Sequence, residues 1–207
     1  VGAGGFFGPI LPNLVMPVAR LYMRKMVGHL VLDAESDALN KILDKAAESG
    51  EQLNLNLLGE AVLGEEEAKS RAERTLKLIQ NPRVTYVSVK ASSMVAQLNQ
   101  WDIDGSVERL KERLRPLYEE AARRNPQVFI NMDMEEYHDL HLTIRLFKEL
   151  MSEPEFKNLE SGIVLQAYLP DTFDALKDIA EFAKQRVAEG GGKVKVRIVK
   201  GANLSME

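Results

Sequence analysis

Cysteine is missing from all 207 residues of this chain. Its absence excludes disulfide bonds, thiolate metal sites and cysteine nucleophiles, and it fits a protein that works in a reducing cytoplasm. An excess of basic charge is missing as well, because the formal net charge is -4 and the basic residues are scattered through helix-like stretches. This charge balance argues against nucleic acid as a partner.

A long uninterrupted apolar run is also lacking. No charged residue precedes Arg20, but Pro9, Pro12 and Pro17 interrupt the opening segment and no basic stretch starts it. These features argue against a signal peptide and a membrane helix. The glycine-rich start, with Gly2, Gly4, Gly5 and Gly8, is predicted to be a flexible lead-in segment rather than a nucleotide loop, because no strand precedes it. The chain starts on Val1 rather than methionine, so we expect it to be a piece of a longer polypeptide.

What the sequence does contain is a regular alternation of strand-like and helix-like segments. Period-two apolar patterns predict strands near residues 53–58, 84–89, 128–132, 162–168 and 193–199. Apolar spacing of three and four predicts helices between them near residues 65–80, 104–124, 140–151 and 172–188. Upstream, similar patterns indicate helices at residues 17–29 and 36–49. Strand, helix and strand in this succession are typical of parallel βα units.

Two parallel-sheet architectures fit this succession. A doubly wound nucleotide-binding sheet would have a glycine-rich turn directly after its first strand, and this chain has only Gly59 and Gly64 there, in the wrong frame. A barrel instead collects polar residues from the ends of many strands. We therefore predict an α/β fold, a (β/α)8 barrel with only about its first five βα units in this chain. The domains we expect are an N-terminal helical lead-in, residues 1–50, and the first part of the barrel, residues 51–207.

Each predicted strand ends on a polar or charged side chain. A buried strand has no packing reason to end in this way, because charged side chains are rarely buried without a partner. The carboxyl ends of the strands therefore predict a functional site, as they do in barrels generally. The residues concerned are Glu60, Lys90, Asp133, Gln166, Arg197 and Lys200.

Three of these residues carry the strongest signal, and each has a plain structural alternative. Strand alternation turns Arg197 toward the barrel axis together with Lys195, unless the segment is a solvated edge strand. Asp133 follows a run too apolar for a surface strand, although it could also begin the acidic first turn of a helix. Lys90 emerges from a buried strand as an anion holder or a Schiff-base nucleophile, or else as a rim lysine that reaches solvent.

Two further strand ends offer groups for a cofactor. The amide of Gln166 can donate and accept hydrogen bonds, which suits a heterocycle, although a structural amide is the simpler explanation. Lys200, Gly201 and Ala202 place a cation and a permissive backbone between a strand and an expected helix, which suits a phosphate. We predict no metal site, because a surface helix face explains His138 better than a metal does.

Five ordered motifs resemble those of the proline dehydrogenase family, above all the flavin domain of the bifunctional proline utilization A proteins. The motifs are NLLGEAVLGEEEA, YVSVKASS, FINMDMEEY, GIVLQAYLPD and VRIVKGANLSME. The resemblance runs from about Leu53 to the end of the chain. It implies an FAD-dependent (β/α)8 barrel that oxidises L-proline to Δ1-pyrroline-5-carboxylate by hydride transfer to flavin N5. This reaction is the first step of proline catabolism, and its electrons pass to a membrane quinone.

The resemblance also implies roles for individual residues. Lys90 pairs with the proline carboxylate, and Asp133 and Arg197 form the polar pair of the active site beside the flavin. The implied cofactor contacts are the backbone of Met134, the side chains of Arg197 and Gln166, and the stretch formed by Lys200, Gly201 and Ala202. The later strands of the family's barrel, which carry further substrate-binding residues, are not in this sequence. We therefore expect this chain to hold an incomplete active site.

The residues alone leave two other functions open. A barrel-type lyase could use Lys90 or Lys200 as its Schiff-base amine. A non-catalytic half-barrel could instead pair with another chain. The resemblance further implies a cytoplasmic homo-oligomer that contacts the inner face of the membrane peripherally. It also implies a fused pyrroline-5-carboxylate dehydrogenase domain further along the polypeptide.

Overall fold

The structure is a computed structural model that describes residues 12–27, 37–57, 62, 64–96, 98–99, 101–134 and 136–201. These residues belong to two compact units, Val1–Lys45 and Ala46–Glu207, which we describe separately. Three predictions fall outside the described residues. They concern the strand end at Glu60, the cofactor contact at Ala202 and the glycine-rich opening at residues 1–11.

The first unit contains helix α2, Pro12–Val27, and the start of helix α3, Asp37–Glu48. Helix α2 starts five residues before the helix predicted at residues 17–29. Proline is well tolerated at a first helical position, because its missing N–H would have no partner within the helix. Among the described helices, none combines the length and the apolar character that crossing a membrane requires.

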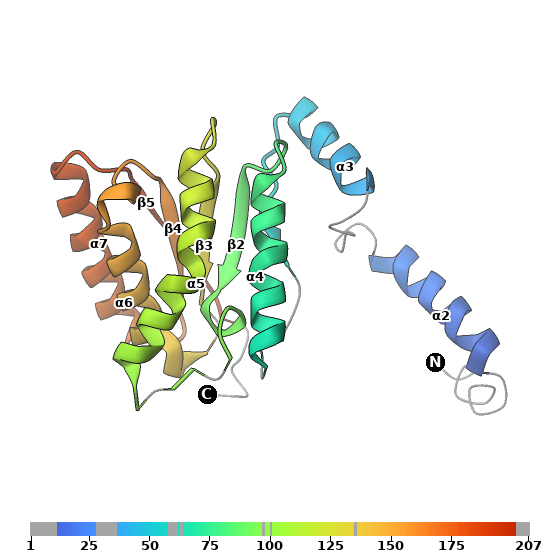
Figure 1. The fold of residues 1–207 in the computed structure, drawn as a ribbon, viewed down its shortest axis with the longest axis horizontal. Coiled ribbons are helices and arrows are strands. Elements are labelled where there is room, and N and C mark those ends of the chain that lie inside the picture. Colours follow the sequence, from blue (N-terminus) through green and yellow to red (C-terminus); the bar gives the residue numbers. More distant parts are fainter. Residues whose placement is uncertain are drawn as a thin grey trace. The chain divides into compact units, whose positions relative to one another are not determined.

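The second unit is built on one parallel sheet whose strand order, β1 to β5, follows the sequence (Figure 1). Each strand pairs with the next along the chain, whereas a doubly wound sheet reverses its direction at a switch point. This winding is that of consecutive units of a (β/α)8 barrel, so the predicted α/β class is confirmed. The strands are β1 Leu55–Asn56, β2 Tyr86–Lys90, β3 Phe129–Asp133, β4 Ser161–Gln166 and β5 Val194–Val199.

Four helices cover one face of the sheet (Figure 1), because right-handed crossovers between sequential parallel strands place every helix on the same side. They are α4 Glu65–Gln80, α5 Ile103–Arg123, α6 Leu140–Met151 and α7 Thr172–Ala188. Apolar spacing predicted the bounds of α4, α6 and α7 to the residue, and α5 begins and ends one residue earlier than predicted. Short 3-10 turns follow β2, precede α6 and precede β4, at η1 Ala91–Ser93, η2 Tyr137–Asp139 and η3 Pro154–Phe156.

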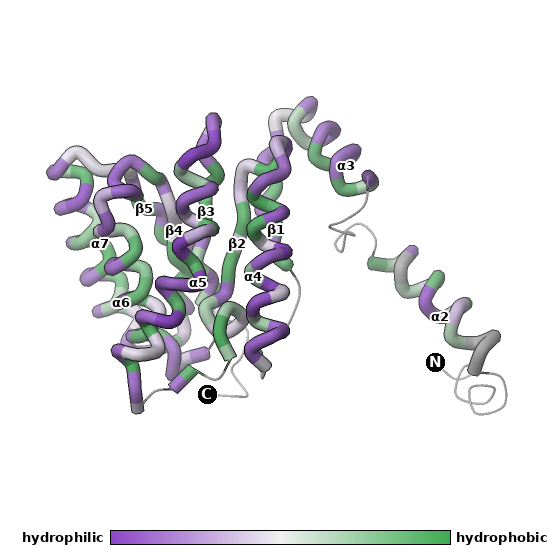
Figure 2. Tube along the Cα trace, viewed as in Figure 1, coloured by the Kyte–Doolittle hydropathy of each residue, from purple (hydrophilic) through white to green (hydrophobic). Residues whose placement is uncertain are grey.

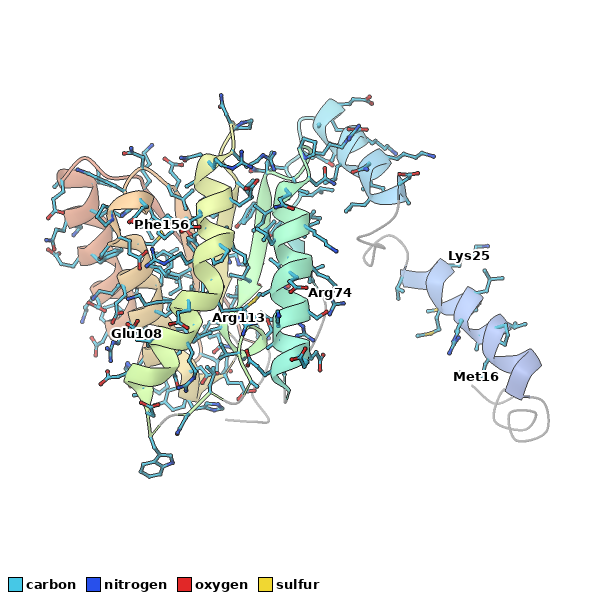
Figure 3. All side chains as sticks on the ribbon, viewed as in Figure 1. Met16, Lys25, Arg74, Glu108, Arg113 and Phe156 are labelled. Carbon is cyan, nitrogen blue, oxygen red and sulfur yellow. The ribbon has the colours of Figure 1, made fainter. Side chains whose placement is uncertain are left out.

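The hydrophobic core lies between these helices and the face of the sheet that they cover, which we call the outer face. Val87, Ile130 and Leu165 point to this face and are fully buried, and apolar character follows the strands in Figure 2. Phe156, labelled in Figure 3, is also fully buried and packs its ring 5.7 Å from that of Tyr118. Burial of each large apolar side chain stabilises the fold by roughly 1.5–3 kcal/mol.

A buried arginine, Arg186, links backbone segments at the amino-terminal end of the sheet through hydrogen bonds. Arg186 of α7 donates hydrogen bonds to backbone carbonyls that precede β4 and β5 and to the end of α6. Burial lowers the pKa of its guanidinium, and the carbonyls compensate for part of the lost hydration. The accepting carbonyls belong to Met151, Phe156, Lys157, Leu159 and Gly192.

The first strand is much shorter than predicted. β1 has only two residues, which pair with Val87 and Ser88, where the pattern predicted a strand over residues 53–58. Asn54 and Asn56 use their side chains to hydrogen-bond to Ser88 and Asp133. The side chains of Asn54 and Asn56 thus make hydrogen bonds on the face of the sheet that the helices do not cover, which we call the inner face.

Candidate active site

Strand register brings three of the predicted site residues to one edge of the sheet. Lys90 is the last residue of β2 and Asp133 the last of β3, and the two are direct partners in the ladder. Arg197 lies on β5 opposite Val164, and its Nη2 reaches back to Asp133 Oδ1 at 2.8 Å. Gln166 ends β4 at the same edge. Carboxyl ends of parallel strands are where barrel enzymes place their chemistry.

The Asp133 carboxylate is the centre of this cluster. Its Oδ1 accepts three hydrogen bonds, from Asn131 Nδ2 at 2.6 Å, Arg197 Nη2 at 2.8 Å and Ser88 Oγ at 3.2 Å. Among the described residues, its Oδ2 accepts one hydrogen bond, a long contact of 3.4 Å from Asn56 Nδ2. The two oxygens of one carboxylate therefore differ strongly in how well they are solvated by the protein.

Burial and charge act in opposite directions on Asp133. Burial raises the pKa of its carboxyl above the ordinary value, and this is the largest effect. The positive charges of Arg197 and Lys90 and the hydrogen bonds from Ser88 and Asn131 lower the pKa without cancelling the rise. Raised carboxyl pKa values beside a specific cation are common at functional sites, although structural ion pairs also produce them.

A layer of polar residues lies directly below Asp133 on the inner face. Asn56, Ser88 and Asn131 are register partners across β1, β2 and β3, and Ser88 and Asn131 are buried. Ser88 Oγ also accepts a hydrogen bond of 2.9 Å from Asn54 Nδ2. We call Asn56, Ser88 and Asn131 the polar layer. Apolar branched residues usually fill this position in a barrel, so packing alone does not account for it.

A lysine and two aromatic rings form the next level down. Lys195 of β5 places its Nζ 4.9 Å from the centre of the Tyr86 ring and 5.6 Å from that of Phe129. The two rings meet edge to face, 4.9 Å apart, and Lys195 Nζ donates to the Tyr86 hydroxyl at 3.3 Å. A cation is attracted to the faces of such rings. The inner face is therefore polar or cationic at each of these levels.

The remaining predicted residues of the described part of the chain, Met134, Gln166, Lys200 and Gly201, follow the ends of β3, β4 and β5 at the same edge. Met134 and Gln166 are buried, while Lys200 is exposed. Gly201 has a φ of +110°, and a Cβ there would stand 1.6 Å from Tyr168 Cε1. Any side chain at position 201 would therefore collide with the Tyr168 ring, so a close approach of backbone requires this glycine.

A small acidic and imidazole cluster follows β3. His138 Nε2 lies 2.9 Å from Glu136 Oε2 and 3.6 Å from Asp139 Oδ1. Asp139 is buried at the start of α6, whereas an acidic side chain in the first turn of a helix is usually solvated. These three residues could hold a metal ion by their spacing, but a surface histidine that contacts two neighbouring acidic side chains explains the same distances.

The sequence reasoning missed the polar layer and the Lys195 ring contacts. A signal was available, because residues two apart in a strand share a face. Ser88 stands two residues before Lys90, and Asn131 two residues before Asp133. Once the two charged residues are assigned to the inner face, the polar residues below them follow. Their hydrogen bonds to a single carboxylate oxygen required the three-dimensional register.

Two grooves lie elsewhere on the unit, away from the strand ends. One of about 440 Å³ lies between α4 and α5, and the ion pair of Arg113 with Glu65 lines it (Figure 3). Another of about 380 Å³ is lined by residues of α6, α7 and the turn between α6 and β4. Charged surface residues of both signs line the first groove, which gives it no convergent set of groups for catalysis.

The strand-end cluster has the parts of a site for an anionic ligand. Arg197 and Lys90 supply positive charge, and Asp133 supplies an acceptor that burial makes more basic. Arg197 Nε is buried and has no hydrogen-bond partner among the described residues. A buried donor without a partner is costly, so a bound group that accepts from this nitrogen would be stabilised.

Comparison with known proteins gives a consistent family assignment. The sequence profile described as proline dehydrogenase matches residues 38–207. Bifunctional PutA proteins of Klebsiella aerogenes and Escherichia coli K12 are each 30% identical over 177 residues, or 79% of this chain and 13% of theirs. The chain thus spans a small part of these curated relatives.

Two solved structures show the same fold. Proline utilization A (PutA) from Corynebacterium freiburgense is 62% identical, with a TM-score of 0.86 over 96% of this chain and 21% of that one. PutA from Bdellovibrio bacteriovorus, inactivated by N-propargylglycine, is 35% identical, with a TM-score of 0.71 over 81% of this chain and 19% of that one.

Proposed function

The chain belongs to the proline dehydrogenase family, and from this premise we propose that its strand-end cluster takes part in the FAD-dependent oxidation of L-proline to Δ1-pyrroline-5-carboxylate. The observation that carries the proposal is the contact between Asp133 Oδ1 and Arg197 Nη2, 2.8 Å long, at the carboxyl ends of β3 and β5. The matching part of the chain includes the whole sheet.

The charged residues suit proline as the substrate. Proline carries a carboxylate that needs a cation, and Lys90 stands beside Asp133 in the strand register. We propose that Lys90 holds the substrate carboxylate, because a lysine ammonium is a compact charge on a flexible stem. Asp133 and Arg197 then border the ring carbon and nitrogen that lose hydrogen. Fixing the substrate between these groups lowers the entropic part of the barrier.

The residues present also fit FAD. Arg197 Nε is a buried donor that lacks a partner among the described residues, and the close packing of Gly201 against Tyr168 leaves bare backbone at the end of β5. We propose that Arg197, Gln166 and the Met134 backbone hold the flavin ring. We propose that Lys200, Gly201 and Ala202 hold the ribityl and pyrophosphate groups, since backbone N–H groups and a cation suit phosphate. A bound FAD would supply the two-electron acceptor for the oxidation.

The partners of the reaction follow from the same family assignment. Because curated relatives are bifunctional PutA proteins, we propose that the full polypeptide also carries a dehydrogenase for the product. We further propose that it is a cytoplasmic homo-oligomer. Its electrons would pass to a membrane quinone, which requires peripheral contact with the inner face of the membrane.

The proposal can be tested with the absorbance spectrum of the longest natural polypeptide that contains this chain. We expect flavin bands that bleach on anaerobic addition of L-proline and persist with L-valine as the matched control. Absence of flavin, or flavin that L-proline leaves oxidised, would contradict the proposal. Trapping of a carbonyl substrate on Lys90 or Lys200 by borohydride would favour the Schiff-base lyase instead.

A further inference from the structure

The side chains of the polar layer on the inner face hydrogen-bond to the carboxylate of Asp133. We propose that Asn131 and Ser88 are positioning residues for the reaction. They fix Asp133 through Oδ1, keep it against Arg197, and leave Oδ2 as the oxygen that meets the ligand. This inference rests on the proposed function and adds two residues to it.

The first support is the convergence of donors on one oxygen. Asn131 Nδ2 and Ser88 Oγ lie 2.6 Å and 3.2 Å from Asp133 Oδ1, alongside Arg197 Nη2 at 2.8 Å. A carboxylate oxygen with three donors is saturated, because it has about two lone-pair sites. Hydrogen bonds of this kind also favour the ionised carboxylate that the pairing with Arg197 needs.

The second support is the cost of building this layer. Asn131 is fully buried, and its Oδ1 has no hydrogen-bond partner among the described residues. A buried amide oxygen without a partner destabilises the fold. The amide cannot turn over to satisfy it, because that would set two oxygens 2.6 Å apart. The amide of Asn131 is therefore oriented so that its NH2 group donates to Asp133, while its oxygen has no hydrogen-bond partner among the described residues.

The third support is the space that the neighbouring strand leaves for Asn131. Its register partner on β4 is Gly162, and a Cβ at that position would stand 2.8 Å from Asn131 Oδ1. The same Cβ would meet the backbone oxygen of Lys195 at 3.0 Å. A glycine in the middle of a buried strand often marks a close approach of this kind. The absence of a side chain at Gly162 thus leaves the space that the Asn131 side chain occupies.

Ser88 is held in turn from the first strand. Asn54 Nδ2 donates to Ser88 Oγ at 2.9 Å, which leaves the hydroxyl hydrogen to point at Asp133 Oδ1, 3.2 Å away. The direction of the hydroxyl is therefore set by its own donor. By contrast, the one contact that Oδ2 of Asp133 makes with the described residues is the 3.4 Å hydrogen bond from the exposed Asn56. That oxygen has capacity for a hydrogen bond from bound substrate or cofactor.

A double-mutant cycle in the longest natural polypeptide tests this inference. The variants are Asn131→Ala, Asp133→Asn and the pair, with kcat/KM for L-proline as the measurement. We expect Asn131→Ala to lower kcat/KM about tenfold when Asp133 is present, as loss of a charge-assisted hydrogen bond would. In the Asp133→Asn background, the same change should lower it less than about twofold, because the residue through which it acts is gone.

Ser161→Ala is the matched control. Ser161 is as buried as Asn131, but it lies on the outer face and its hydroxyl donates to the backbone oxygen of Ile130. Its loss should change kcat/KM less than about twofold in both backgrounds. Equal losses for Asn131→Ala with and without Asp133, or for Ser161→Ala and Asn131→Ala, would overturn the inference.

Two further measurements test the role of Ser88 and separate failure of the positioning role from failure of the proposed function. Ser88→Thr, which retains the hydroxyl, should keep more of the rate than Ser88→Ala, and the reverse order would contradict positioning by Ser88. If L-proline does not bleach the wild-type flavin, the proposed function has failed separately. In that case the same double-mutant cycle is measured with the free energy of unfolding in urea, which needs no substrate. Coupling between Asn131 and Asp133 there supports the positioning, and strictly additive effects overturn it.

Discussion

The two faces of the sheet in the second unit carry side chains of different polarity. On the outer face, strand residues such as Val87, Ile130 and Leu165 are apolar, fully buried and covered by helices. On the inner face, their neighbours in the same strands are Ser88, Asn131 and Gln166. Alternation along a strand separates the two sets by one residue. One face therefore stabilises the fold, and the other is free to hold chemical groups.

This division teaches where changes should act. Outer-face substitutions should reduce stability and leave the reaction rate of the remaining folded molecules unchanged. Substitutions at the inner strand ends should reduce the rate with little effect on stability.

The largest expected effect is on the outer face. Phe147 of α6 is fully buried, with its ring 6.4 Å from that of Phe182. Phe147→Ala should lower the free energy of unfolding by about 3–5 kcal/mol, because it leaves a cavity in the core. Urea denaturation measures this loss. The control Phe173→Ala, at a ring that is 66% exposed, should cost less than about 1 kcal/mol, and equal losses would contradict the assigned core.

Next in size is the buried arginine at the amino-terminal end of the sheet. Arg186→Met should lower the free energy of unfolding by about 3 kcal/mol, because it leaves several buried carbonyls without their charged donor. Thermal and urea unfolding both report it. Arg123→Met is the control, since Arg123 is exposed and its one ion pair with a described residue is to Glu120, one turn away. If the two variants unfold alike, Arg186 has no special structural role.

The third effect is on the inner face and on rate. Arg197→Met should lower kcat/KM for L-proline by about 100-fold, a loss typical of one preorganised charge at a reacting centre. Its stability should change little, because the side chain is 36% exposed. Steady-state kinetics measures the rate. Arg145→Met on the surface of α6 should leave kcat/KM unchanged, and a comparable loss there would mean that the effect is not local.

The smallest effect concerns pH. Burial raises the folded-state pKa of Asp133 above its ordinary value of 3.8. The stability that this group contributes is therefore complete below the unfolded pKa and is lost as the pH rises through the folded pKa. Relative to Asp133→Asn, wild-type protein should become less stable as the pH rises above 3.8. Urea unfolding over this range measures the difference. A difference of opposite sign would mean that the pairing with Arg197 outweighs burial.

The sequence was sufficient for the parts of the fold that depend on period and spacing. The bounds of α4, α6 and α7 followed from apolar spacing, and the five strands from alternation. Asp133 and Arg197 were found because charge at the end of a buried strand has no packing explanation. The predicted site residues that lie on these strands reach the same edge of the sheet, because parallel strands align their carboxyl ends.

Other features depend on contacts between distant residues. The convergence of Ser88 and Asn131 on a single oxygen of Asp133 depends on register between three strands. The short first strand reflects asparagine side chains that bond across the sheet. Helix α2 starts at Pro12 rather than at the predicted residue 17, because proline is tolerated at the first position of a helix. Arg186 looks like any surface arginine in the sequence, because its partners are backbone carbonyls.

The most direct test of the account compares Asp133 on the inner face of the sheet with Asp178, an exposed acidic residue of α7. The measurement is the rate of anaerobic flavin bleaching by L-proline in the longest natural polypeptide. Asp133→Ala removes the centre of the inner-face cluster, and Asp178→Ala removes the outer partner of Lys148. We predict a rate at least about 100-fold lower for Asp133→Ala and a wild-type rate for Asp178→Ala. Equal rates for the two variants, or bleaching that survives loss of Asp133, would contradict the account.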